Sequence, residues 1–328
     1  MRKAATQSLF KPVIYLTTAL LLSANLLAQQ MADPEFNSSV ERPAYSRKHP
    51  KVIIDEAHSN FHTADGRYKP FADLLRNDGY QVVPGTNKFK KESLEGAKVL
   101  VIANAAAPDA SDDTSAPAFT QEECDAVRVW VRAGGSLLLI ADHAPFGSAA
   151  ENLARQFGVE MGKGYVFDLA NNDRSPTTLV FSQENGLLGN HPLLRGRNPS
   201  EQVKRVVAFT GQSLSVPEGA IALMRLGPGA HESPNRRELQ AAVEMASSRS
   251  AISADHARAA GGRAQGVAMK FGRGRVVILG EAAMFSAQVI RSTQAGQTRE
   301  SRMGMNVPGN DDKQFALNVL RWLSGLLN

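Results

Sequence analysis

The chain has 328 residues, a length that is sufficient to bury one large hydrophobic core. Its 37 basic and 32 acidic residues leave a small positive charge, and three of the basic residues (Arg2, Lys3 and Lys11) lie near the N-terminus. The rest of the chain is too weakly charged to predict nucleic-acid binding. The single cysteine, Cys124, excludes an internal disulfide framework.

Residues 1–28 have the pattern of a secretory signal peptide. A basic start precedes an apolar run at residues 13–22, and small residues occupy much of 23–28. We therefore predict cleavage near Ala28 and a periplasmic or secreted protein. A membrane anchor is the alternative, but the apolar run is short for a span of about 20 residues. No stable membrane anchor is expected after cleavage.

The first half of the remaining chain alternates predicted strands with predicted helices. Residues 29–50 are polar and contain prolines, which indicates an extended N-terminal arm. Thr120 and Glu123 form a capping box at the start of one helix, and Ser148 with Glu151 is expected to cap the next. The fold class predicted is α/β, a mostly parallel sheet flanked by helices. The elements behind this prediction are strands at 52–54, 80–83, 99–103 and 137–141, and helices at 68–77 and 120–133.

After residue 160 the alternation stops. Residues 203–209 and 220–226 have the composition of strands, and 229–265 indicates a long loop with some helix. We predict an insertion at about 160–265 within a single α/β domain at 51–328. A hairpin at 267–279 and a helix from about Asp311 complete that domain.

Polar side chains follow several of the predicted strands. Because ligands of a parallel sheet bind outside the carboxyl ends of its strands, these groups are expected to share one site. The residues at these positions are Asp55, Glu56, His58, Asn60 and His62 after the first strand, Asn104 after the third, Asp142 and His143 after the fourth, and Glu281 after a late strand.

Two kinds of chemistry fit this set of residues. A divalent metal such as zinc prefers imidazole and carboxylate ligands and would activate a water. A histidine beside a carboxylate can instead act as a general base without metal. The sequence leaves both open. The candidate metal ligands are Asp55, His58, His62 and His143, and the candidate catalytic residues are Asp55, His58, Asp142, His143 and Glu281.

Two further groups in the insertion have a functional and a structural interpretation. His191, in Asn190-His191-Pro192, is either an additional ligand or a turn residue. The polar run at Asp168, Asn171, Asn172 and Asp173 is either a cation site or a solvated turn.

Three segments and the C-terminal helix carry a resemblance to a known superfamily. They are residues 52–63 (VIIDEAHSNFHT), 134–145 (GGSLLLIADHAP) and 274–281 (GRVVILGE), with the helix in 310–327. The chain resembles the class I glutamine amidotransferase-like superfamily and, within it, an exported bacterial family of unknown function. The resemblance implies a flavodoxin-like fold and leaves the insertion unmatched.

The sequence departs from true amidotransferases at the nucleophile. Those enzymes place a cysteine after a strand, whereas here the strand after Gly134-Gly135 ends in Asp142-His143. Cys124 lies upstream, on the predicted helix, where we expect it to pack in the core. Glutamine hydrolysis through a thiolate is therefore not expected, and the order of motifs is more similar to the trehalose-utilisation-type branch.

We predict a hydrolase acting on a small polar substrate, sugar- or amide-containing, at this Asp/His/Glu site. The alternative is a non-catalytic module that binds a carbohydrate or a protein of the cell envelope. The expected partner is a small molecule or carbohydrate, and nucleic acid is not expected. A pocket that gathers the polar residues favours the enzyme, and a shallow, open site favours the binding module.

Overall fold

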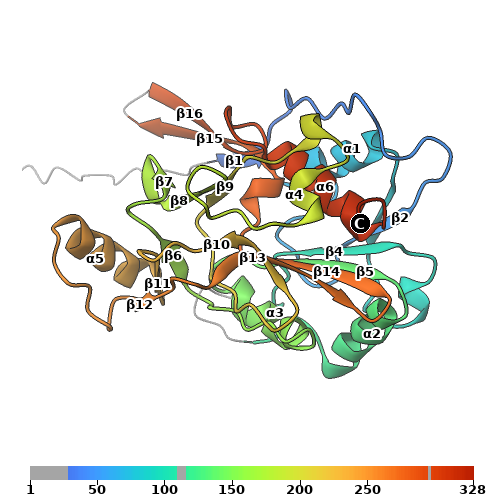
Figure 1. Ribbon diagram of the computed structural model, residues 1–328, viewed down its shortest axis with the longest axis horizontal. Helices are drawn as coiled ribbons and strands as arrows, with labels where there is room; N and C mark the ends of the chain where they lie inside the picture. The colour runs from blue at the N-terminus through green and yellow to red at the C-terminus, as the bar shows by residue number, and fades with distance from the viewer. Residues whose placement is uncertain (1–28, 109–115, 295–296) are drawn as a thin grey trace, which may run out of the picture.

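The computed structural model describes residues 29–108, 116–294 and 297–328 (Figure 1). The predicted signal peptide lies outside these residues. At the centre is a seven-stranded sheet. Its strands, in spatial order, are β10 (Ile221–Arg225), β13 (Ala264–Phe271), β14 (Gly274–Leu279), β5 (Ser136–Ile140), β4 (Val99–Ala103), β2 (Lys51–Asp55) and β3 (Gln81–Gly85).

The five strands from β14 to β3 are parallel, and β13 and β10 continue the sheet antiparallel. The predicted α/β class with a mostly parallel sheet is confirmed. In the parallel part, the carboxyl ends of β2, β4, β5 and β14 lie along one edge, which is where the sequence places its polar residues.

Helices cover both faces of this sheet (Figure 1). One face carries α1 (Lys69–Asn77), α4 (Pro192–Arg195) and α6 (Asp312–Leu323), and the other carries α2 (Gln121–Arg132) and α3 (Phe146–Arg155). The capping box at Thr120 and Glu123 is confirmed. The cap at Ser148 is wrong, because α3 already begins at Phe146 and Ser148 lies within its first turn. Short 3-10 helices occur at η1 (Glu92–Leu94), η2 (Pro199–Glu201) and η3 (Ala283–Phe285).

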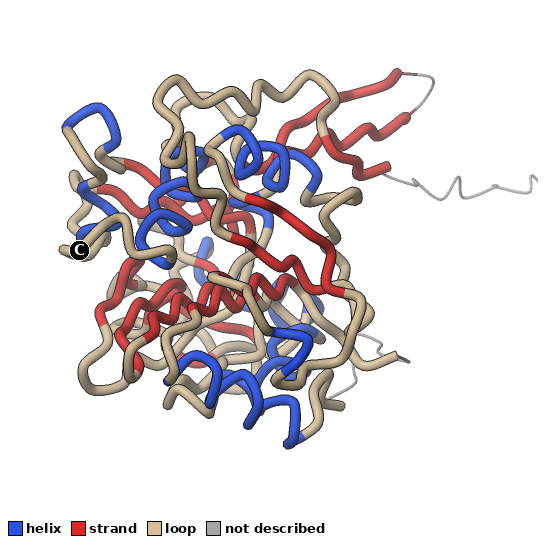
Figure 2. Tube along the Cα trace, turned by 90° about the vertical axis from the view of Figure 1, so that its right-hand side faces the viewer, coloured by secondary structure: helices blue, strands red, loops and turns tan. Residues whose placement is uncertain are grey.

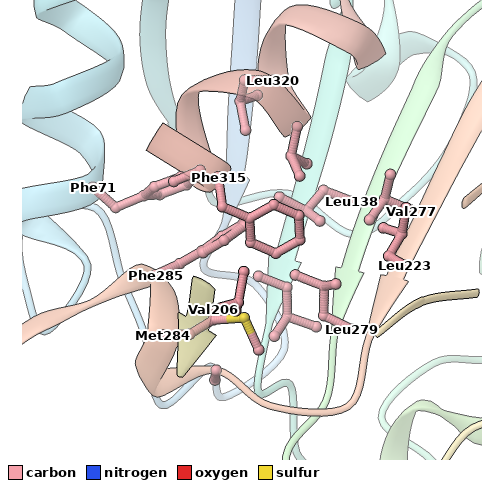
Figure 3. Close-up of a cluster of buried hydrophobic side chains, with 14 of the residues drawn as sticks. Phe71, Leu138, Val206, Leu223, Val277, Leu279, Met284, Phe285, Phe315 and Leu320 are labelled. Atoms are coloured by element: carbon pink, nitrogen blue, oxygen red, sulfur yellow. The ribbon is translucent and has the colours of Figure 1, made fainter. Parts of the chain in front are cut away.

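Alternating side chains of each central strand enter two different cores. On the α1 and α6 face, the rings of Phe71, Phe285 and Phe315 pack over sheet residues such as Leu138 and Leu279 (Figure 3). On the other face, apolar side chains of α2 and α3 pack on the sheet, and Cys124 is one of them. The prediction that Cys124 packs in the core is confirmed.

Apart from β10 and the start of β13, which belong to the main sheet, residues 160–265 form small elements beside it. One small sheet contains β6 (Tyr165–Phe167), β11 (His231–Ser233) and β12 (Arg258–Ala259), and another contains β7 (Asn172–Asp173), β8 (Ser175–Ser182) and β9 (Arg205–Phe209). Helix α5 (Arg236–Ser247) lies at the end of the molecule away from α2 (Figure 1). It packs through a small apolar cluster of its own around Ala242.

A three-stranded sheet that the sequence does not predict projects from the body (Figure 2). The hairpin of β15 (Ala287–Gln294) and β16 (Gln297–Gly304) pairs with β1 (Gln29–Ala32), from the predicted N-terminal arm. We call this sheet the hairpin sheet. No helix among the described residues is long and apolar enough to cross a membrane.

Candidate functional site

The ends of β4, β5 and β14 place Asn104, Asp142 and Glu281 close to one another. Ile140 of β5 pairs with Leu279 of β14, so Asp142 and Glu281 each follow their paired residue by the same distance along the chain. Asn104 follows β4 with a φ of 48°, a left-handed conformation that asparagine tolerates better than most residues. Its Oδ1 accepts a hydrogen bond of 2.9 Å from the backbone N–H of Asp142. This bond ties two neighbouring strand ends together.

A cavity of about 430 Å³ opens at this edge of the sheet. It lies between the strand ends, the start of α5 and the hairpin sheet. Its walls combine phenylalanine rings with polar groups, as small-molecule sites commonly do. The lining includes Phe61, His62, Asn104, Asp142, His143, Phe146, Phe209, Thr210, Arg236 and Gln288.

Asp142 and Glu281 form a carboxyl pair at this wall, with Asp142 lining the cavity and Glu281 buried. Burial raises the pKa of Asp142, although its side chain keeps 13% exposure and lines the cavity. Glu281 is fully buried, and burial together with the charge of Asp142 raises its pKa well above the usual range. The Glu281 carboxyl accepts backbone hydrogen bonds from Ala283 and Met284 at 2.6 and 2.8 Å. Such mutually perturbed carboxyls favour a functional site over a structural one.

The ring of His143 stands beside Asp142 at the cavity wall. Its Nδ1 lies 2.8 Å from the carbonyl oxygen of Ala144. A carbonyl only accepts, so Nδ1 carries the proton and, in the neutral ring, Nε2 keeps its lone pair. Nε2 lies 4.0 Å from Oδ1 of Asp142. The ring of Tyr165 stacks on the His143 ring, with 4.4 Å between the two ring centroids. The His143 ring is thereby held in place beside the Asp142 carboxyl.

His62 lines the same cavity in a different state. Burial, assisted by Arg67, lowers its pKa to about 3, so the ring is neutral. Its ring packs against Tyr68 at 4.5 Å. Among the described residues, neither Nδ1 of His62 nor Oε1 of Gln288 has a hydrogen-bond partner, although both side chains are buried. Two buried polar atoms without partners at one cavity indicate a polar ligand or ordered water there.

Asp55 and His58 belong to a separate, buried group on the α2 side of the sheet edge. Nδ1 of His58 lies 2.9 Å from Asp55, and Nε2 lies 2.9 Å from Glu123. The ring sits between Phe89 and Phe119, with centroids 4.5 and 4.7 Å away. Neither Asp55 nor His58 lines the cavity. The expectation of one shared cluster therefore needs correction: His143 lines the cavity, whereas His58 is buried among apolar rings and carboxyl groups away from it.

This placement bears on the candidate metal ligands. Carboxylates engage both ring nitrogens of His58, which leaves no lone pair for a metal. Within the described parts of the chain, no group of three or more His, Cys, Asp or Glu side chains is arranged to hold a metal ion. Of the four candidate ligands, only His62 and His143 lie at the cavity.

The two ambiguous groups of the insertion are engaged in local structure. Nδ1 of His191 accepts from the backbone N–H of Leu193 and caps α4, and burial lowers its pKa to about 4. Asp168 accepts hydrogen bonds from the backbones of Ala170 and Asn171 and from the Asn171 side chain. Both arrangements are those of turn and cap residues.

Sequence reasoning misses several cavity residues because they come from distant segments. Thr210 follows β9, Arg236 begins α5, and Gln288 belongs to β15 of the hairpin sheet. Nothing local marks Arg236, which lies in an Arg-rich stretch. The one local indication for Thr210 is its position after a predicted strand, next to Gly211.

Comparisons with known proteins concern the fold. No family model and no curated protein matches the chain. Among solved structures, the N-terminal domain of mmIFT52 matches with a TM-score of 0.55 and 14% identity, over 84% of this chain and 97% of that chain. A putative ThuA-like protein from Bacteroides uniformis matches with a TM-score of 0.42 and 15% identity, over 86% and 94%. A putative GMP synthase protein from Thermoplasma acidophilum has a TM-score of 0.36 and 12% identity, over 84% and 97%.

The chain shares the α/β fold of the mmIFT52 N-terminal domain. The superfamily resemblance stays an expectation from the sequence motifs, and a fold shared at 14% identity does not imply a shared activity. The strand ends that the structure describes carry no cysteine. Cys124 is buried in α2, where burial raises the pKa of its thiol to about 12. A thiol in that state is a poor nucleophile.

Proposed function

We propose that this protein is an exported hydrolase that acts on a small polar substrate, sugar- or amide-containing, in the cavity at the strand ends. The observation that supports it is the His143–Asp142 pair on the cavity wall, with Nε2 and Oδ1 4.0 Å apart. Export rests on the leader-like residues 1–28.

His143 serves as the general base. Its Nε2 lone pair accepts a proton from a water molecule, and the hydroxyl oxygen attacks the electrophilic carbon of the substrate. The backbone carbonyl of Ala144 fixes the tautomer that this step requires. The hydrogen bond on Nδ1 also holds the ring plane in place.

Asp142 serves as the general acid. Its raised pKa lets it hold a proton closer to neutral pH than an exposed aspartate does. It gives that proton to the leaving group as the bond to the substrate carbon breaks. The proton on His143 then passes to the Asp142 carboxylate beside it, and both groups return to their starting states. Glu281, behind Asp142, is kept neutral by burial and does not need to react.

Chromogenic nitrophenyl glycosides and sugar-linked amides are the substrates for the first test. We expect turnover that falls about 100-fold or more in Asp142→Asn and in His143→Gln, the range of general acid–base catalysis. His231→Gln is the matched control, because His231 also bonds a backbone carbonyl through Nδ1, at 2.9 Å, but does not line the cavity.

The alternative is a binding module for a carbohydrate or an envelope protein. Saturable binding of these sugars with no turnover in the wild type, or turnover that survives both cavity variants, would contradict the hydrolase. The first result would favour the binding module.

A further inference from the structure

Arg236 is the cation of the cavity. Among the described residues that line the cavity it is the one arginine or lysine. His62 is neutral there, because its pKa is about 3. The described residues include no carboxylate within ion-pairing distance of the Arg236 guanidinium, whereas the next residue, Arg237, is paired with Glu238. An exposed, unpaired guanidinium at a cavity rim is available to a ligand.

The position of Arg236 is defined by the fold. Asn235 caps α5 by accepting from the backbone N–H of Glu238, so Arg236 is the first residue of the helix. Its guanidinium lies over the ring of Tyr165, 5.6 Å from the centroid. The same ring stacks on His143. Tyr165 therefore connects the cation to the proposed base.

We propose that the cavity selects a hydroxylated ring that carries a carboxylate, a sugar acid, and that Arg236 binds the carboxylate. This inference rests on the proposed function, because it places the ligand in the same cavity. The inference adds Arg236 as a residue that determines specificity. Arg236 belongs to the insertion at 160–265, and the sequence alone left the role of that insertion open.

The chemistry of the walls favours this ligand class. A guanidinium presents paired N–H donors that match the two oxygens of a carboxylate. The phenylalanine rings at Phe61, Phe146 and Phe209 offer apolar surface to a sugar ring. Gln288 and His62 offer polar atoms without partners to its hydroxyls.

The charge balance also favours an anion. Asp142 is the acidic residue on the cavity wall, and although burial raises its pKa, the charge of Arg236 acts in the opposite direction without forming an ion pair. When Asp142 is protonated, it donates a hydrogen bond to a carboxylate instead of repelling it. A neutral ligand would leave the guanidinium unpaired.

The test is calorimetric binding of D-glucuronate and of D-glucuronamide, its neutral counterpart, to the full-length mature protein. We expect glucuronate to bind roughly tenfold or more tightly than the amide, as a charge-assisted hydrogen-bonded pair implies. Arg236→Gln should abolish that preference. Arg237→Gln, on the same exposed turn and outside the cavity, should keep it.

Equal binding of the two sugars, no binding of glucuronate, or an unchanged preference in Arg236→Gln would overturn the proposal. Binding is measured without turnover, so the two proposals fail separately. If glucuronate binds through Arg236 but no substrate is cleaved, only the proposal of hydrolase activity is contradicted. If cleavage depends on Asp142 but glucuronate is not preferred over glucuronamide, only the proposed role of Arg236 is contradicted.

Discussion

Asp142 and Glu281 each lie two residues beyond the paired ends of two neighbouring parallel strands, and the charge of Asp142 adds to burial in raising the pKa of Glu281. The register of β5 and β14 creates this proximity, since Ile140 and Leu279 are paired. Two neighbouring carboxyls that cannot both ionise readily are an unfavourable feature for a core. We attribute their presence to the cavity in front of Asp142.

The first prediction concerns Glu281. In the folded protein it keeps its proton above the pH at which the unfolded chain releases it. Stability is therefore unaffected below the unfolded pKa and falls as pH rises toward the folded pKa. Glu281→Gln imitates the protonated side chain and should lose this fall. Urea unfolding at pH 5 and pH 8 measures it.

The expected result is a smaller loss of unfolding free energy from pH 5 to pH 8 in Glu281→Gln than in the wild type. Glu92→Gln, at an exposed position, is the control and should behave as the wild type. An identical pH dependence in wild type and Glu281→Gln would show that Glu281 is ionised in the fold.

The second prediction concerns His58. Its ring nitrogens lie 2.9 Å from the buried carboxyl groups of Asp55 and Glu123, and the ring packs between two phenylalanines. Hydrogen bonds from Thr120, His58 and Phe89 outweigh the effect of burial and lower the pKa of Glu123, so this carboxylate stays ionised. The substitution His58→Ala removes the hydrogen bond between His58 and the Glu123 carboxylate. It should lower the free energy of unfolding by about 3 kcal/mol or more.

Chemical denaturation measures this loss, and sugar binding at the cavity should persist in the variant wherever it stays folded. His49→Ala, which removes an exposed histidine, serves as the comparison. A His58→Ala protein with wild-type stability and no ligand binding would return His58 to the functional site.

The difference between His58 and His143 shows where sequence reasoning reaches its limit. Parallel strands deliver the residues that follow them to one edge, so the meeting of Asn104, Asp142 and Glu281 is predictable from the strand pattern. The direction of a side chain in the next loop is not. The chain turns after β2 through Ser59, with a φ of 47°, and His58 points to the α2 face while His62 reaches the cavity.

Residues from distant segments are also beyond prediction. Arg236 reaches the site because α5 packs against β6 and β11 of one small sheet. No local sequence pattern indicates this long-range contact. The hairpin sheet escapes prediction for a related reason. Its strands β15 and β16 are rich in Gln, Arg, Ser and Thr, and their sequences lack the clear apolar alternation that marks a strand.

The third prediction concerns Cys124. The thiol is buried among α2 and sheet side chains and its pKa is about 12. Cys124→Ser places a hydroxyl in an apolar site and should lower stability by about 1–2 kcal/mol. Turnover and sugar binding should be unchanged, as measured at a temperature well below the unfolding transition. A large loss of turnover with the fold intact would place the nucleophile at Cys124.

The last prediction concerns His62, whose pKa is lowered from 6.5 to about 3 by burial and by Arg67. Below pH 6.5 the unfolded chain takes up a proton at this residue, while the folded protein does so only near pH 3. The unfolded state is therefore favoured progressively as pH falls across this range. At pH 4.5 the effect amounts to roughly 2.5 kcal/mol.

His62→Gln cannot be protonated and should lose this contribution. The free energy of unfolding, measured in urea at pH 7 and pH 4.5, should fall by about 2.5 kcal/mol less in His62→Gln than in the wild type. His49→Gln should reproduce the wild-type fall, because His49 is exposed. If His62→Gln and the wild type lose equal stability between the two pH values, His62 is not held neutral at the cavity wall, and its unpartnered nitrogen no longer supports a polar ligand there.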